Sequence, residues 1–105
     1  MDAQIKKGLL DACVLTMLSR ATSYGYAITA EMQRVLDVSE SSLYPVLRRL
    51  EQSGCLATYQ RPHNGRMRKY YSITPDGRRK LIAIKDEWTE VLEVINFVMN
   101  EGEIA

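Results

Sequence analysis

Basic and hydrogen-bonding side chains gather in one stretch of the chain, residues 39–74. Its first part, SESSLYPVLRRLEQSG, has the pattern of a short amphipathic helix that ends at Gly54. Its second part is a basic segment built around the turn Asn64-Gly65. Arg and Lys bind phosphates, and Arg also reads guanine through two hydrogen bonds. Because a polar helix beside a basic hairpin is a common way to grip a DNA groove, we predict that the chain binds double-stranded DNA.

The predicted DNA contacts form two groups, one on the helix and one on the hairpin. At 100° per residue, the helix face opposite the apolar stripe and its flanks carry Ser41, Ser42, Tyr44, Pro45, Arg48 and Arg49. The hairpin contributes Arg61, His63, Arg66, Arg68 and Lys69.

Ordinary structural roles remain open for several of these residues. Arg48 can instead pair with Glu51 or Gln52, and the serines can cap the helix. Arg68 and Lys69 can instead be strand-edge charges that block aggregation.

Pro45 conflicts with a helix that begins at Ser39, because proline lacks an N–H and its ring clashes with the preceding turn. We therefore expect the regular helix to begin near Ser41 or Ser42, with Pro45 at the edge of its first turn.

Two further helices are predicted before this one. Residues 5–19 are apolar on nearly every side, and such a helix must be covered all round. A domain this small covers one side only, which is a first indication of a dimer. A second helix, from Ala27 to about Leu36, precedes a short break at residues 37–40, so the second and third helices have the spacing of a helix-turn-helix.

The hairpin pattern fixes a strand register. With Asn64-Gly65 as a two-residue type I′ turn, His63 faces Arg66 at the tip. Leu56 then faces Ile73 at the base of the hairpin. Thr58 faces Tyr71, and Tyr59 faces Tyr70. The base is therefore apolar and the tip is basic.

A long helix is predicted from Pro75 to Asn100, with Thr74 as its N-cap. Apolar residues recur at spacings of 3 and 4 from Leu81 to Val98, as in a coiled-coil seam, and the helix would be about 37 Å long. It is predicted to be a dimerisation helix. The predicted interface comprises Leu10, Val14, Leu81, Ile84, Trp88, Val91, Ile95 and Val98.

The expected fold is mainly α with a small β-hairpin. It is a winged helix-turn-helix at residues 1–74, followed by the dimerisation helix at residues 75–105 in the same compact unit. Residues 1–85 hold all 14 basic residues and 7 acidic ones, whereas residues 86–105 hold 6 acidic residues and no basic one. This asymmetry favours a nucleic-acid-facing body with its acidic end turned away from the phosphates.

Other classes of protein lack support in the sequence. Cys13 and Cys55 show no metal-ligand spacing, so we expect free thiols, no metal and no cofactor. No catalytic triad, carboxylate pair or phosphate-binding loop is present, so no enzyme is expected. The apolar run Leu9–Leu18 is about half the length that spans a bilayer, and no signal peptide is recognisable, so we expect a cytoplasmic protein without a membrane partner.

Four segments together form a recognisable pattern, KGLLDACVLTMLS, YGYAI (Tyr24–Ile28), SSLYPVLRRLEQSGCL (Ser41–Leu56) and RKYYSITPDGRRKL (Arg68–Leu81). In these segments the chain resembles the PadR family of winged-helix transcriptional regulators. A single helix after the wing is similar to the short subfamily. The resemblance implies a homodimeric repressor in which the last helix of each subunit packs on the first helix of its partner.

The resemblance also implies a ligand site. In some members a flat aromatic ligand lies between paired tryptophans, and Trp88 sits at a position like theirs. Gly8 and Ala12 are small and lie one turn apart, which leaves room opposite Trp88, and Leu92 and Ile5 complete the predicted ligand site. Alternatively, Trp88 is simply a large interface anchor. The expected function is that of a repressor that binds a two-fold operator and is released by a planar or aromatic ligand. The alternative is a winged-helix module that binds protein instead of DNA.

Overall fold

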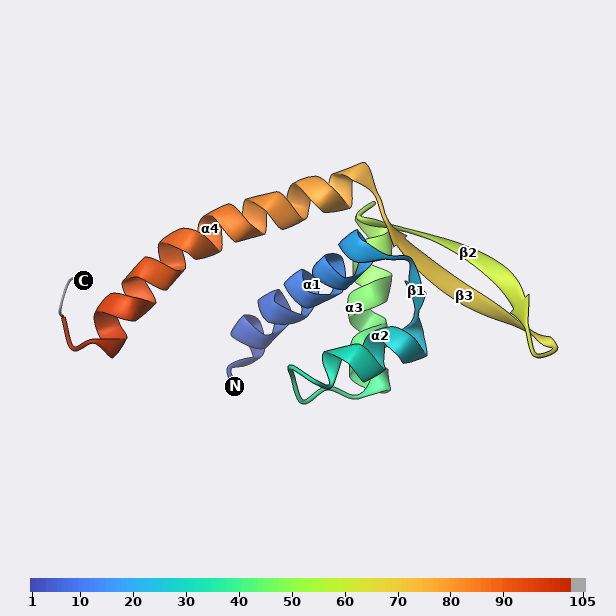
Figure 1. Ribbon diagram of the computed structural model, residues 1–105, viewed down its shortest axis with the longest axis horizontal. Helices are drawn as coiled ribbons and strands as arrows, with labels where there is room; N and C mark the ends of the chain where they lie inside the picture. Colours follow the sequence, from blue (N-terminus) through green and yellow to red (C-terminus); the bar gives the residue numbers. More distant parts are fainter. Residues whose placement is uncertain (103–105) are drawn as a thin grey trace.

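A computed structural model describes residues 1–102 and contains, over this range, four helices and one three-stranded sheet. In chain order the elements are α1 (Ala3–Arg20), β1 (Ser23–Tyr24), α2 (Gly25–Met32), α3 (Glu40–Gln52), β2 (Leu56–His63), β3 (Arg66–Ile73) and α4 (Pro75–Met99). Figure 1 shows that α4 and the β2–β3 hairpin extend in opposite directions from a body formed by α1, α2 and α3. The predicted fold, mainly helical with a small wing, is confirmed.

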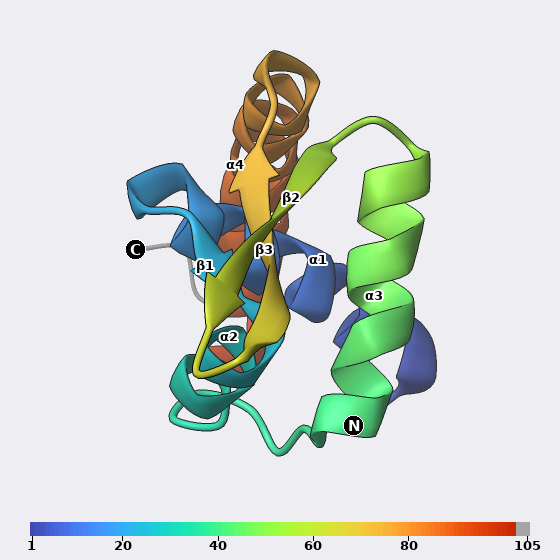
Figure 2. The ribbon, with the colours of Figure 1, turned by 90° about the vertical axis from the view of Figure 1, so that its right-hand side faces the viewer.

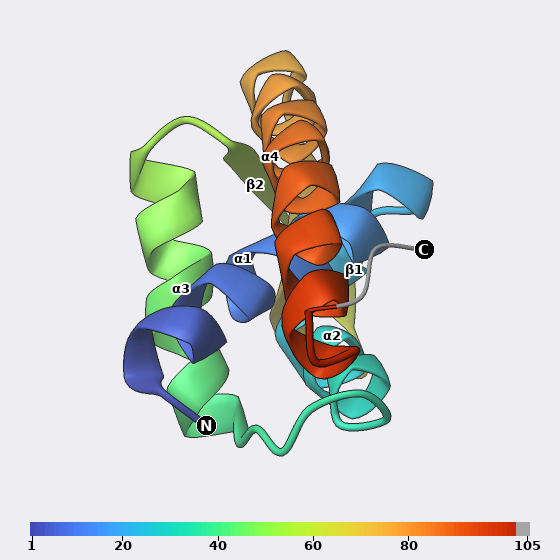
Figure 3. The same ribbon diagram turned by 90° about the vertical axis from the view of Figure 1, so that its left-hand side faces the viewer.

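The core forms around α1. α2, α3, β3 and α4 each pack against α1, and Val14 and Leu15 at its centre are fully buried. In Figure 3, α1 runs between α3 at the left and α4 at the right.

This packing corrects part of the predicted dimer interface. Leu10, Val14 and Leu81 retain only 7%, 0% and 6% of their exposure, so these three residues lie in the subunit's own core. Ile84 is half-buried against the same core. The expectation that α1 needs a partner chain for its second side was wrong for these positions, because α4 folds back onto α1 within the chain.

The predicted hairpin register is confirmed for all eight pairs, from Leu56 opposite Ile73 to His63 opposite Arg66. Asn64 and Gly65 both have positive φ, 52° and 79°, as a type I′ turn requires.

The sheet has one strand that the sequence did not predict. Ser23 and Tyr24 pair with Tyr71 and Tyr70, which gives the strand order β1-β3-β2. A strand of two residues is too short to show an alternating pattern, so periodicity could not reveal it.

The expected start of α3 was wrong. The helix begins at Glu40, and the Ser39 side chain accepts a hydrogen bond from the backbone N–H of Ser42. Pro45 therefore lies inside the helix. A serine N-cap stabilises the first turn. Because Pro45 has no N–H, the Ser41 carbonyl loses its usual helical donor. Both residues are at the surface, so this carbonyl stays accessible to water.

The second helix is shorter than expected, because α2 ends at Met32. Residues 33–36 form turns, in which the Leu36 N–H donates to the Met32 carbonyl at 2.9 Å. The Gln33 side chain then donates to the Val38 carbonyl, also at 2.9 Å, which holds the connection to α3.

The predicted start of α4 is confirmed, and its end differs by one residue from the expected Asn100. The Thr74 hydroxyl accepts from the Gly77 N–H at 3.0 Å and donates to the Gly54 carbonyl at 2.6 Å. Gly77 lies directly against the turn between α3 and β2, so a Cβ there would overlap the Cys55 carbonyl oxygen. This close approach fixes α4 against the wing base.

Replacing Gly77 with alanine should lower the free energy of unfolding by about 1–3 kcal/mol, because an added methyl group has no space. Urea unfolding followed by circular dichroism measures this. The matched control is Gly8→Ala, where the added Cβ would lie 3.7 Å from Trp88 Cζ2, an ordinary contact. That variant should be as stable as the wild type or more so. Equal stability of all three proteins would contradict the tight junction at Gly77.

Candidate nucleic-acid interface and apolar groove

One face of α3 is polar and accessible. Leu43, Val46, Leu47 and Leu50 point into the core. The opposite side exposes five of the predicted contacts, Ser41, Ser42, Tyr44, Pro45 and Arg48. Within residues 1–102, Arg48 forms no ion pair, so the alternative pairing with Glu51 is not seen.

Arg49 does not join this exposed face. Its guanidinium forms two hydrogen bonds with the Asp11 carboxylate on α1, at 2.9 and 3.0 Å. The sequence prediction placed Arg49 among the DNA contacts because it lies on the flank of the polar face. The structure instead turns the side chain toward α1.

The first turn of α3 is a cluster of hydroxyl groups. Ser39 Oγ lies 3.0 Å from Ser41 Oγ and donates to Ser42 Oγ at 2.9 Å. Capping of the helix is thus performed by Ser39, which leaves Ser41 and Ser42 exposed at the helix N-terminus. Backbone N–H groups at such a terminus favour an anion.

Tyr44 is held by an acid that the sequence analysis missed. Its hydroxyl donates to Glu40 Oε1 at 2.8 Å, and this bond, with partial burial, raises the pKa of Tyr44. Tyr44 also lies against the start of α2, where a Cβ on Gly25 would come within 2.9 Å of Tyr44 Oη. The spacing of four residues between Glu40 and Tyr44 was a detectable signal, because such residues share a helix face.

The wing residues divide between two faces of the hairpin. Opposed residues in an antiparallel pair point to the same side. The observed register therefore puts the basic residues Arg61, His63, Arg66 and Arg68 on one face. Lys69 points to the other face, where its ammonium lies 3.3 Å from Glu51 of α3.

Tyrosines form a row beneath the wing arginines. The Tyr59 and Tyr70 rings stack at 5.3 Å, and Tyr24 meets Tyr70 edge-on at 5.7 Å. The guanidinium of Arg68 lies 3.8 Å from the Tyr24 ring centre, and that of Arg61 lies 5.2 Å from Tyr59. The pairing of Tyr59 with Tyr70 was predictable from the register, whereas the role of Tyr24 depends on the unpredicted β1.

A cleft joins the helix face to the wing, and we call it the helix–wing cleft. It has a volume of about 370 Å³ and is lined by Tyr24, Gly25, Tyr26, Tyr44, Arg68, Lys69 and Tyr71. In Figure 2 the hairpin stands beside α3, with the start of α2 below it. Residues from α2, α3 and β3 thus form one continuous basic and aromatic surface.

A second cavity lies where α1 meets α4, and we call it the Trp88 groove. It measures about 410 Å³ and collects four of the five predicted ligand residues, Ile5, Gly8, Trp88 and Leu92, together with Gln4, Leu9, Val91 and Ile95. The fifth, Ala12, lines an adjacent pocket of about 300 Å³ that also touches Trp88. The half-buried indole therefore separates two apolar spaces.

The second half of α4 is uncovered. Val91, Ile95 and Val98, all in the predicted dimer interface, are exposed, as are their neighbours Leu92, Val94, Phe97 and Met99. Among residues 1–102, no helix is both long and apolar enough to span a membrane. The same residues hold no cluster of potential metal ligands.

A helix-turn-helix followed by a two-stranded wing, with basic side chains on both parts, defines a winged helix-turn-helix protein. The chain belongs to the PadR-like family of transcriptional regulators, whose sequence profile matches residues 14–83. It is a transcriptional regulator and not an enzyme.

Three relatives illustrate the match. Transcriptional regulator Rv3488 of Mycobacterium tuberculosis is 44% identical over 59 residues, which cover 55% of each chain. The crystal structure of smu.1704 from Streptococcus mutans is similar with a TM-score of 0.84 and 33% identity, over 94% of this chain and 93% of that one. A PadR-like transcriptional regulator from Bacillus cereus gives a TM-score of 0.81 with 31% identity, over 92% and 97% of the two chains.

Proposed function

We propose that this protein is a homodimeric repressor that binds a two-fold DNA operator and is released by a planar aromatic ligand. The observation that carries the DNA-binding part is the helix–wing cleft, because it joins the exposed face of α3 to the cationic wing. In this proposal α3 enters the major groove and the wing contacts the adjacent backbone.

Arg48 is proposed to read bases, and the wing arginines are proposed to bind phosphates. Arg48 is exposed on the outer face of α3 and can bond guanine through two N–H groups. On the wing, Arg61 lies directly opposite Arg68 in the strand register. Like charges in that position repel one another, and a phosphate near both guanidinium groups would offset the repulsion.

The exposed end of α4 supports the proposed homodimer. A row of large apolar side chains in water is unfavourable unless another surface covers it. A two-fold pair of chains brings two copies of α3 to two half-sites of DNA. The acidic residues Asp86, Glu87, Glu90 and Glu93 lie on α4, which extends away from the wing and so from the proposed DNA (Figure 1).

The Trp88 groove supports the proposed ligand site. Its lining is mainly apolar, and an indole face can stack on a planar ring or a cation. Because α1 lines both this groove and the contact with α3, a ligand that favours one arrangement of α1 and α4 would change operator affinity.

DNA binding is tested with two variants on a duplex that the wild-type protein selects from a random-sequence library. Arg48→Ala should weaken binding by about 1–3 kcal/mol and relax base preference in each half-site. Arg66→Ala should weaken binding to all duplexes alike and reduce the salt slope by about one. Half-sites should lie roughly 10 bp apart.

Arg79→Ala is the control, because Arg79 pairs with Asp76 within α4 and is not among the proposed DNA contacts. It should bind like the wild type. If the Arg48 and Arg66 variants both match the wild type, the assignment of helix and wing is wrong. Association that persists at high salt with no preference for nucleic acid would instead indicate a protein partner.

The homodimer is tested by placing charge on the exposed apolar row. The double variant Ile95→Glu/Val98→Glu should be a folded monomer by light scattering, because paired carboxylates would be buried between the subunits. Val98 is 64% exposed, so the substitution does not disturb the subunit's own core. Thr89→Glu adds one carboxylate to another side of α4 and should remain dimeric. A monomeric wild-type protein would refute the proposal.

Ligand binding is tested through Trp88, the only tryptophan in the chain. Titration with a planar cationic dye such as ethidium should quench the fluorescence of Trp88. The dye should also lower the affinity of the protein for the selected duplex. Leu92→Arg, in the same groove, should abolish quenching without unfolding the protein, because Leu92 is exposed. The control Leu36→Ala lies outside the groove and should keep the quenching. If a panel of such planar compounds gives no quenching, Trp88 is an anchor only.

A further inference from the structure

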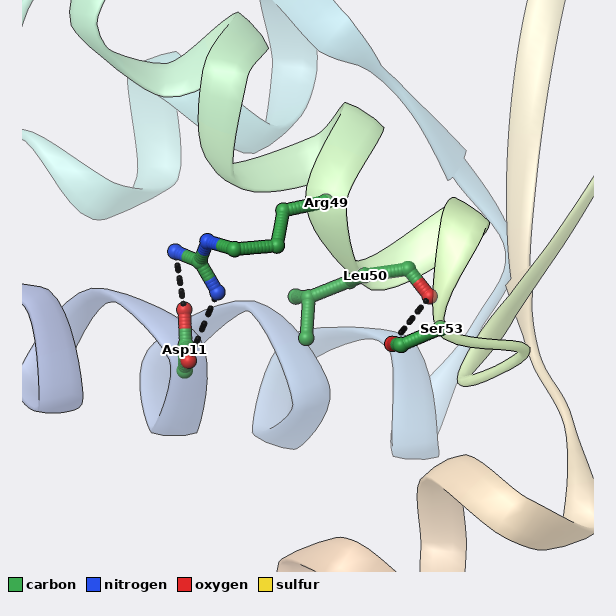
Figure 4. Close-up of polar contacts among 4 residues, drawn as sticks. All are labelled: Asp11, Arg49, Leu50 and Ser53. Carbon is green, nitrogen blue, oxygen red and sulfur yellow. Dashed lines mark hydrogen bonds and ion pairs between the residues drawn. The ribbon is translucent and has the colours of Figure 1, made fainter.

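Arg48 and Arg49 are adjacent on α3, but their side chains point in different directions. Arg48 points to solvent, whereas Arg49 reaches back to α1 and binds both oxygens of Asp11 (Figure 4). Nη1 donates to Oδ2 at 3.0 Å, and Nη2 donates to Oδ1 at 2.9 Å. Asp11 is 7% exposed and is the only charged residue buried in the part of the chain that the structure describes.

This contact differs in kind from the apolar packing that holds α3 in the core. Glu51 ties α3 to the wing through Thr58 and Lys69. The core anchors are the apolar side chains Leu43, Val46, Leu47 and Leu50, and apolar contacts have no preferred direction. Two parallel hydrogen bonds between planar groups fix both a distance and an orientation. Because a buried ion pair is often no more stabilising than apolar residues of similar volume, a role in alignment accounts for the pair better than stability does.

Asp11 lies in the turn of α1 that borders the Trp88 groove. Gly8, three residues earlier on α1, would place a Cβ 3.7 Å from the Trp88 ring, and Ala12 lines the adjacent pocket that includes Trp88. One turn of α1 therefore borders the two apolar spaces beside the indole at Gly8 and Ala12, and binds α3 through Asp11.

We propose that Asp11 and Arg49 are positioning residues that set the angle of α3 relative to α1 and transmit movements of α1 to the DNA-reading face. This inference rests on the proposed function, since it assumes that α3 reads DNA. It differs from the sequence prediction, because Arg49 acts here through Asp11 and not through a contact with DNA.

The test compares Asp11→Asn, Arg49→Lys and Arg49→Gln on the selected duplex and on a scrambled duplex. Asp11→Asn keeps the size of the side chain, and Arg49→Lys keeps the charge but loses the two-bond geometry. Each should weaken binding to the selected duplex roughly 5- to 50-fold, with the double variant Asp11→Asn/Arg49→Gln no weaker than the singles, as for residues that act as one unit. Affinity for the scrambled duplex and the salt slope should not change, because no phosphate contact is lost.

Arg20→Gln is the matched control, since it removes the exposed ion pair between Arg20 and Glu31 that links α1 to α2. It should leave selective binding unchanged. Thermal melts establish that each variant is folded at the assay temperature. Should Asp11→Asn fail to fold, Arg49→Lys carries the same comparison.

Three results would overturn the inference. If Asp11→Asn binds like the wild type while Arg49→Gln lowers the salt slope by about one, Arg49 is a phosphate contact. If all variants bind like the wild type, the pair does not position α3. If the wild-type protein selects no duplex, the proposed function fails, and the pair is judged by NMR. Asp11→Asn should then shift the amide resonances of residues 40–44 and 46–48, and unchanged resonances would refute the positioning role.

Discussion

The burial of α1 is the constraint on which the rest of the structure depends. Its buried residues Val14, Leu15 and Leu18 are enclosed by α2, α3, β3 and α4, so the elements that position the functional side chains are placed relative to this one helix. A small domain can bury only a small apolar area, and packing the other elements around one central helix makes use of that area. The consequence is that α3 and the wing face outward on one side while α4 is free to extend on the other.

Local sequence signals predicted the parts of the fold that local chemistry determines. The hairpin register follows from Asn64-Gly65, because a two-residue turn leaves a single pairing for the strands. The start of α4 follows from Thr74 and Pro75 for the same reason, since a capping hydroxyl and a proline act within a few residues. At Pro45 two local rules disagreed, and the capping preference of Ser39 outweighed the cost of an interior proline.

Contacts between distant parts of the chain escaped prediction. The sequence showed which types of residue form the candidate interface. It did not show that Glu51 binds Lys69, or that Asp11 binds Arg49 across 38 positions. Helical periodicity identifies an apolar face and does not say which neighbour covers it, which is why Leu10, Val14 and Leu81 were assigned to a partner chain. β1, and with it the ring of Tyr24 beneath Arg68, was missed for another reason, because two residues are too few to show a strand pattern.

Pro45 removes one backbone hydrogen bond from the outer face of α3. The helix is held in the core on both sides of this residue, by Leu43 before it and by Val46, Leu47 and Leu50 after it, and its first turn also relies on the Ser39 cap and the bond from Tyr44 to Glu40. The core face of α3 is therefore fixed, whereas its outer face has one carbonyl without a helical partner. If α3 reads DNA as proposed, the missing bond lets the helix bend slightly and adapt to half-sites whose grooves differ in width.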